Sequence, residues 1–201
     1  MNYRANIWAI HELGVRKILA TAAVGSLSSN FWLGDLVLLD QFLDFTKSRP
    51  QTFYEGGKQG VLHVDMTEPY CSAVRRVVMN ASEQLGLPVK NGACYVCTEG
   101  PRFETPAEIR MFQRLGADLV GMTSVPEVVL ARELGMCYAS IGMVTNEAAG
   151  IAKHPLTHAE VMESMKVLSV KVAQLIQATF ELWTPSQSCL CASANEEVGK
   201  F

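Results

Sequence analysis

Residues 99–108 read Glu-Gly-Pro-Arg-Phe-Glu-Thr-Pro-Ala-Glu and mark a change from one kind of backbone structure to another. The Gly-Pro pair is a structure breaker, and the run from Thr105 to Glu108 supplies the N-cap, N1 and N3 residues of a capping box. Phe103 and Glu104 are therefore held directly in front of a helix N-terminus. An aromatic ring beside a carboxylate suits a flat, hydrogen-bonding ligand such as a purine.

Apolar residues on both sides of this junction alternate between strand and helix periodicity. Strands are predicted at residues 17–23, 35–45, 93–98, 117–122 and 136–145. Helices are predicted at residues 2–13, 68–85, 105–115, 124–134 and 157–182. This alternation favours an α/β fold with a mainly parallel sheet. Residues 1–182 are expected to form one domain, and the mostly polar residues 183–201 a C-terminal tail.

Three capping boxes are predicted, each after a strand or an irregular loop. They are Thr105-x-x-Glu108, Ser124-x-x-Glu127 and Thr157-x-x-Glu160. In open α/β sheets, ligands bind beyond the carboxyl ends of strands, where helix N-termini also gather. A capping box can also do no more than start its helix. A capping box that coincides with polar residues at a strand end therefore gives only modest support for a ligand site.

Composition limits the classes of function. The chain has 201 residues, of which 49% are apolar and 18% charged, so a globular domain with a substantial core is expected. The net charge of -3 disfavours a nucleic-acid partner. No apolar run reaches the roughly 18 residues of a membrane span, and no signal peptide precedes the first helix. A cytoplasmic protein without a membrane partner is expected.

Cysteine spacing raises the alternative of a zinc protein. Cys94-x-x-Cys97 and Cys189-x-Cys191 are pairs of the kind that hold metals, although a site needs further ligands at suitable spacing. Cys94 and Cys97 fall on a predicted strand, so their side chains should point to opposite faces. Buried apolar cysteines are therefore favoured over a metal site, and no metal ligand is predicted.

Several longer runs carry a family resemblance. They are NYRANIWA (residues 2–9), TAAVGSL (21–27), GDLV (34–37), DQF (40–42), EGPRF (99–103), GMTSVPE (121–127) and ASI to TN (139–146). Together they resemble the trimeric purine nucleoside phosphorylase and methylthioadenosine phosphorylase family, over residues 2 to about 182. The resemblance implies a three-layer α/β fold whose mixed, mainly parallel central sheet is flanked by helices.

The family resemblance also implies an activity. Such enzymes form homotrimers that cleave the N-glycosidic bond of a purine nucleoside with orthophosphate, and release a free purine and a sugar 1-phosphate. Orthophosphate is then a co-substrate, and neither a metal nor an organic cofactor is implied. The transition state resembles an oxocarbenium ion, so the site must hold phosphate, grip the ribose and stabilise the departing purine.

By this resemblance three residues would bind the base. Phe103 would stack on the purine, and Glu104 would accept a hydrogen bond from N1–H and, in guanine, from the exocyclic amine. Asn146 would hydrogen-bond N7 and O6 and stabilise the leaving group. Each residue also has a structural interpretation: Phe103 as core, Glu104 as a partner of the helix dipole, and Asn146 as a turn residue.

Five further residues would contact the sugar and the phosphate. Met122 would lie against the ribose, while Thr123 and the backbone at Ala23 would bind phosphate. His158 stands where 6-oxopurine enzymes carry a histidine for the 5′-hydroxyl, and His63 would reach a neighbouring subunit's site near the 5′ position. Alternatively, Met122 packs within a strand and His158 is a solvated surface residue.

The residue after Phe103 separates two branches of the family. The methylthioadenosine branch typically has serine there and an Asp-Tyr-Asp run later, whereas this chain has Glu104 and TNEAAG at residues 145–150. A carboxylate cannot donate to adenine N1, so inosine and guanosine are the predicted substrates, in purine salvage. A phosphorylase of methylthioadenosine or methylthioinosine, in methionine salvage, is the first alternative. A catalytically weak purine-binding protein is the second.

The family pattern also extends to the N-terminal side of this sequence. Relatives carry an earlier strand with a Gly-rich loop and an Arg-His pair, both of which contact phosphate, and neither occurs among these 201 residues. The chain is therefore expected to be N-terminally truncated and to lack the first strand or strands. Weak or absent phosphorolysis is expected of it, because a phosphate dianion would lose its cationic clamp.

Overall fold

The computed structural model describes residues 1–152, 155, 157–184, 189–196 and 198–199. The seven strands of the main sheet are β1 (Lys17–Ser26), β2 (Leu36–Leu38), β3 (Gln41–Phe45), β5 (Val89–Asn91), β6 (Cys94–Thr98), β7 (Leu119–Gly121) and β8 (Cys137–Glu147). A small second sheet pairs β4 (Val61–Leu62) with β9 (Val198–Gly199). The helices are α1 (Tyr3–Glu12), α2 (Ser72–Leu85), α3 (Pro106–Arg114), α4 (Glu127–Glu133) and α5 (His158–Glu181), with 3-10 turns η1 (Gly57–Gln59) and η2 (Cys191–Ser193).

The main sheet is mixed. Its strand order is β3-β6-β7-β1-β8-β2-β5. Four neighbouring pairs are parallel, namely β3–β6, β6–β7, β1–β8 and β2–β5, whereas β1–β7 and β2–β8 are antiparallel. The predicted mixed, mainly parallel sheet is thus confirmed.

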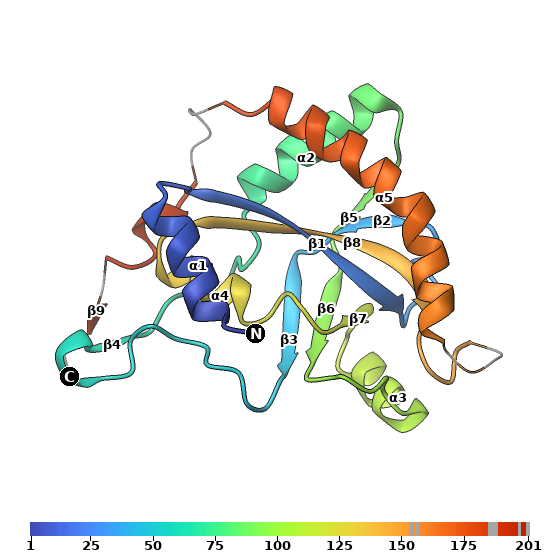
Figure 1. Cartoon of the computed structure of the whole chain (residues 1–201), viewed down its shortest axis with the longest axis horizontal. Coiled ribbons are helices and arrows are strands. Elements are labelled where there is room, and N and C mark those ends of the chain that lie inside the picture. Colours follow the sequence, from blue (N-terminus) through green and yellow to red (C-terminus); the bar gives the residue numbers. More distant parts are fainter. Residues whose placement is uncertain (153–154, 156, 185–188, 197, 200–201) are drawn as a thin grey trace.

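Helices cover both faces of this sheet (Figure 1). On one face, Val78 of α2 and Leu175 of α5 share an apolar cluster with Ile141 of β8. On the other face, Val128 of α4 clusters with Tyr138 of β8. Ile141 and Tyr138 are three residues apart on one strand, so their side chains point to opposite faces. The predicted three-layer arrangement is confirmed.

Strand β8 lies at the centre of the fold and is buried on both faces. Residues 137–145 are all buried, as expected for a strand covered by helices on both sides. Its last residues lie at the end of the sheet where helices α3 and α5 begin. Both helices start with the predicted capping boxes, at Thr105–Glu108 and Thr157–Glu160.

The single strand predicted at residues 35–45 is wrong, because the chain forms two strands there. β2 pairs with β8 and β5, while β3 pairs with β6 at the far edge of the sheet. The backbone changes partners at Leu39 and Asp40, whose amides donate to the carbonyls of Ser140 and Ala93. Apolar periodicity continues across this change, so the sequence pattern does not reveal it.

The capping box predicted at Ser124 is also wrong. Helix α4 begins at Glu127, after Pro126, and has no side-chain cap. The Ser124 hydroxyl is buried and pairs with Tyr70 Oη at 2.8 Å. The Glu127 carboxylate accepts a hydrogen bond from the Tyr138 hydroxyl at 2.9 Å. Tertiary partners thus take both side chains away from the helix end.

The described part of the C-terminal tail packs against the domain. Cys191 in η2 is buried, and β9 adds to β4. None of the helices in the described part of the chain is both long and apolar enough to cross a lipid bilayer.

Candidate active site

A pocket of about 190 Å³ opens beyond the ends of β1, β7 and β8, beside the first turn of α5. Seven of the eight residues predicted for the site line it: Ala23, Phe103, Glu104, Met122, Thr123, Asn146 and His158. They come from five separate segments of the chain. The structure therefore brings together residues that sequence analysis could connect only through the family resemblance.

His63 is the predicted residue that does not line this pocket. It is exposed and directly follows β4. Figure 1 places β4 at the opposite end of the molecule from α3, whose N-terminus borders the pocket. Within one chain, His63 is therefore separated from the other seven residues.

Phe103 and Glu104 present different surfaces to the pocket. Phe103 is 40% exposed, so it is no core residue, whereas Glu104 is only 9% exposed. The hydroxyl of Thr98 donates to Glu104 Oε1 at 2.6 Å. This contact orients the carboxylate without using Oε2. The ring and the acid are available as a stacking surface and an oriented hydrogen-bond acceptor.

Asn146 lies near the end of β8, where the pairing of β8 with β1 shifts register between Val24 and Gly25. Such irregularities often re-aim a side chain beside a site. Thr145 Oγ1 donates to Asn146 Oδ1 at 2.9 Å, and Asn146 Nδ2 donates to the Glu147 carbonyl at 2.9 Å. A β-carbon at Gly25 would lie 3.1 Å from Asn146 Nδ2, so Gly25 leaves the amide its space.

Met122 and Thr123 follow directly after β7. The Thr123 amide donates to Tyr95 Oη at 3.1 Å, which fixes the backbone at this strand end. Gly100 has φ +69°, and a β-carbon there would lie 2.6 Å from Met122 Sδ. Glycine at position 100 thus permits both the backbone conformation and the close approach of Met122.

Arg49 is a residue of this region that sequence analysis missed. Its side chain is only 9% exposed. Nη1 donates to the carbonyls of Met122 at 2.8 Å and Val125 at 2.6 Å, and Nη2 donates to those of Thr98 at 3.1 Å and Glu99 at 3.0 Å. One guanidinium thereby joins the two loops that carry Glu104 and Met122. Its position in a polar loop gave no signal of burial.

Arg102 and Glu108 fix the loop before α3 from the solvent side. Arg102 Nη1 and Nη2 contact the two carboxylate oxygens of Glu108 at 2.8 and 2.7 Å. Hydrogen bonds from Arg102 and from the Thr105 amide lower the pKa of Glu108 to about 2. The Glu108 carboxylate therefore closes the capping box and also holds the segment that carries Phe103 and Glu104.

Comparison with known proteins agrees with this geometry. Residues 1–181 match the family described as the phosphorylase superfamily. A Pyrococcus furiosus protein named 6-oxopurine nucleoside phosphorylase is 52% identical over 199 residues, which cover 96% of this chain and 75% of the relative. A Methanopyrus kandleri protein named probable S-methyl-5′-thioinosine phosphorylase is 54% identical over 197 residues, which cover 98% of this chain and 76% of the relative.

A solved structure supports the same assignment. Methylthioadenosine phosphorylase from Schistosoma mansoni, in complex with adenine, superimposes with a TM-score of 0.89 at 34% identity. The superposition covers 97% of this chain and 75% of that one. These matches confirm the resemblance and the nucleoside phosphorylase fold. The chain therefore belongs to the phosphorylase superfamily.

Proposed function

We propose that this protein cleaves 6-oxopurine nucleosides such as inosine and guanosine with orthophosphate, releasing a free purine and a sugar 1-phosphate. The observation that carries this proposal is the buried Glu104 carboxylate in one pocket with Phe103 and Asn146. Relatives named as known or probable 6-oxopurine nucleoside phosphorylases share about half of their aligned residues with this chain, and they support the same reaction class. The enzyme would act as a pentosyltransferase in purine salvage.

Hydrogen-bond polarity links Glu104 to the choice of base. An ionised carboxylate only accepts hydrogen bonds, and hypoxanthine and guanine both carry a proton on N1. Adenine N1 is itself an acceptor, so adenine would place two acceptors face to face in a buried site. Such a mismatch costs on the order of 1–3 kcal/mol, which is enough to select between bases.

Asn146 would assist departure of the base. Its amide can donate to N7 of the purine, where negative charge collects as the glycosidic bond breaks. Phe103 offers a face for stacking on the base. Met122 would lie against the ribose, and His158 at the start of α5 would meet the 5′-hydroxyl.

We place orthophosphate beside Thr123 and the backbone at Ala23, on the ribose side of the same pocket. Ala23 lies on β1, which pairs with the strand β8 that carries Asn146, and Thr123 follows Met122 directly after β7. The reaction would need orthophosphate as a co-substrate and no organic cofactor. In a homotrimer, His63 of one subunit would reach a neighbouring subunit's site near the 5′ position of the nucleoside. The enzyme would act in the cytoplasm.

S-methyl-5′-thioinosine is a second candidate substrate. Glu104 recognises the base and not the 5′ substituent, so a 6-oxopurine with a 5′-methylthio group satisfies the same carboxylate. The Methanopyrus kandleri relative, at 54% identity, carries that name. His158 favours a hydroxyl over a methylthio group, because an imidazole can hydrogen-bond the hydroxyl.

Phosphorolysis rates on four nucleosides test the proposal: inosine, guanosine, methylthioinosine and methylthioadenosine. We expect kcat/KM for inosine to exceed that for methylthioadenosine by at least about tenfold, from the cost of an acceptor mismatch. A preference for methylthioadenosine would overturn the assignment of Glu104. Calorimetry with hypoxanthine, with and without phosphate, separates an enzyme from a purine-binding protein, whose affinity would not depend on phosphate.

A further inference from the structure

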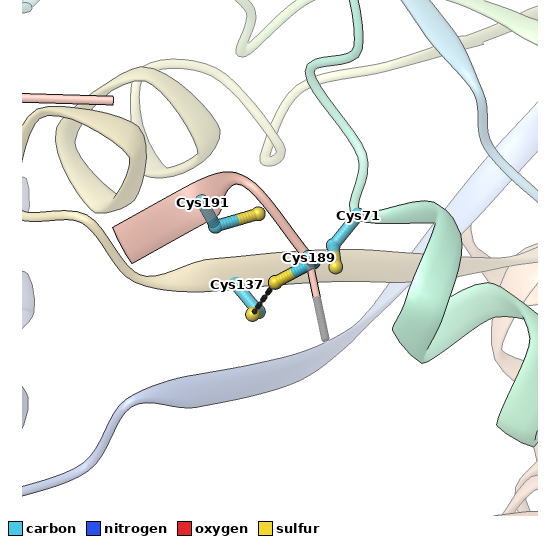
Figure 2. Close-up of side chains that lie close together, drawn as sticks. All are labelled: Cys71, Cys137, Cys189 and Cys191. Atoms are coloured by element: carbon cyan, nitrogen blue, oxygen red, sulfur yellow. Dashed lines mark hydrogen bonds between the residues drawn. The ribbon is translucent and has the colours of Figure 1, made fainter. Parts of the chain in front are cut away.

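Four cysteine side chains from distant parts of the chain meet at one point (Figure 2). Cys71 is the N-cap residue of α2, Cys137 begins β8, and Cys189 and Cys191 belong to the C-terminal segment. The four sulfur atoms all lie within 4.8 Å of one another. Three of the side chains are buried and that of Cys189 is half-buried.

The spacing of the sulfur atoms fits a tetrahedral metal ion. A zinc ion with Zn–S bonds of about 2.3 Å holds its four sulfurs about 3.8 Å apart. Cys137 Sγ and Cys189 Sγ lie 3.3 Å apart, and no pair exceeds 4.8 Å. An S–S bond of a disulfide is about 2.05 Å long, so this pair is in hydrogen-bond contact and is not bonded.

One cationic side chain and one helix N-terminus lie beside the sulfurs. Arg132 Nη1 donates to Cys191 Sγ at 3.3 Å, and Arg132 is held in turn by the Asp65 carbonyl at 3.1 Å. Cys71 stands at the N-terminus of α2, where the helix dipole favours a thiolate. Both features compensate the negative charge that a tetrathiolate site carries.

We propose that Cys71, Cys137, Cys189 and Cys191 bind one zinc ion. Four thiolate ligands complete a tetrahedron and leave no open position, so the site is structural. A surface cavity lined by Asp65, Cys71, Arg132 and Leu190 gives an ion access to the sulfurs. The ion would tie the C-terminal segment to the starts of α2 and β8.

This proposal departs from the expectation that the cysteines hold no metal. The expectation rested on Cys94 and Cys97, which lie on β6, away from the four sulfurs, with Cys97 buried in the core. Of the two motifs, only Cys189-x-Cys191 contributes. Its partners, Cys71 and Cys137, are far from it and from each other in the sequence, so spacing alone could not identify the set.

Metal content of the purified protein is the direct test. Protein purified under reducing conditions without chelator should contain about one zinc ion per chain, as measured by inductively coupled plasma mass spectrometry. Replacing the zinc by cobalt should give the visible absorption of a tetrahedral cobalt thiolate centre. Cys191→Ser should lose most of the zinc. Cys94→Ser is the matched control, because it removes a thiol outside the cluster, and it should keep the zinc.

Cobalt binding by the unmodified chain does not depend on whether the Cys191→Ser variant folds. Absence of both bound zinc and a cobalt thiolate spectrum would overturn the proposal. Two disulfides among these cysteines in metal-free protein would also overturn it. The intact-chain mass would detect them as the loss of two hydrogen atoms for each disulfide. Equal zinc loss in Cys191→Ser and Cys94→Ser would show that the ion, if present, binds elsewhere.

Discussion

Replacing Glu104 by glutamine tests how the pocket selects its base. The change keeps the size of the side chain and removes its charge. The glutamine amide can donate to adenine N1, which the carboxylate cannot do. Thr98, whose hydroxyl lies 2.6 Å from Glu104 Oε1, can still donate to the amide oxygen. That contact leaves the amide nitrogen pointing into the pocket.

The expected effect follows from the burial of Glu104, which is 9% exposed. A hydrogen bond to a charged group in such a place contributes about 1.5–3 kcal/mol. Its loss should lower kcat/KM for inosine by about 10- to 150-fold, at 1.4 kcal/mol for each factor of ten. Adenosine loses an acceptor mismatch at the same time. The ratio of inosine to adenosine rates should therefore fall by more than either rate changes alone.

Steady-state phosphorolysis of inosine and adenosine, for the parent protein and the Glu104→Gln variant, measures this ratio. Glu83→Gln is a matched control, because it makes the same change in an exposed acid on α2 that does not line the nucleoside pocket. The control should keep the base preference of the parent. An inosine-to-adenosine ratio in Glu104→Gln within about twofold of the parent would refute the role of the carboxylate, since that is below the expected effect.

Three further changes have defined outcomes. Arg49→Ala should lower the free energy of unfolding by at least about 2 kcal/mol in urea titrations, because four carbonyl oxygens lose their donor; a loss below about 0.5 kcal/mol would contradict this role. Glu108→Gln should lower the melting temperature at neutral pH. This difference should shrink as pH falls from 4.5 towards 2 and the parent carboxylate is protonated; a constant difference would exclude the ion pair with Arg102. Arg132→Gln should weaken zinc binding about 10- to 100-fold in chelator competition, and unchanged affinity would argue against its contact with the sulfurs.

Local patterns predicted the parts of the site that depend on neighbouring residues. The capping box at Thr105–Glu108 forms as predicted and places Phe103 and Glu104 at the pocket. The end of β8 likewise brings Asn146 to the same place. In each case a strand or a helix boundary, visible in a few consecutive residues, decides where the side chain lies.

Long-range contacts account for what the sequence could not predict. Arg49 donates to carbonyls 49 to 76 positions along the chain, and main-chain acceptors carry no residue signature. Ser124 matches a capping box in the sequence, but the buried hydroxyl of Tyr70 binds it instead. The break at Leu39 and Asp40 depends on which strands lie beside them. These outcomes are decided by tertiary partners, which periodicity does not encode.

Strand β8 connects the two sites and also separates them. Cys137 at its first residue belongs to the sulfur cluster, and Asn146 near its end belongs to the pocket. Nine residues of extended chain span about 30 Å, so a change at one end has no direct contact with the other. Both sites depend on the same buried strand, since residues 137–145 hold the sheet together. Loss of zinc would therefore act on the pocket through the stability of the fold, while the preference between bases stays with Glu104.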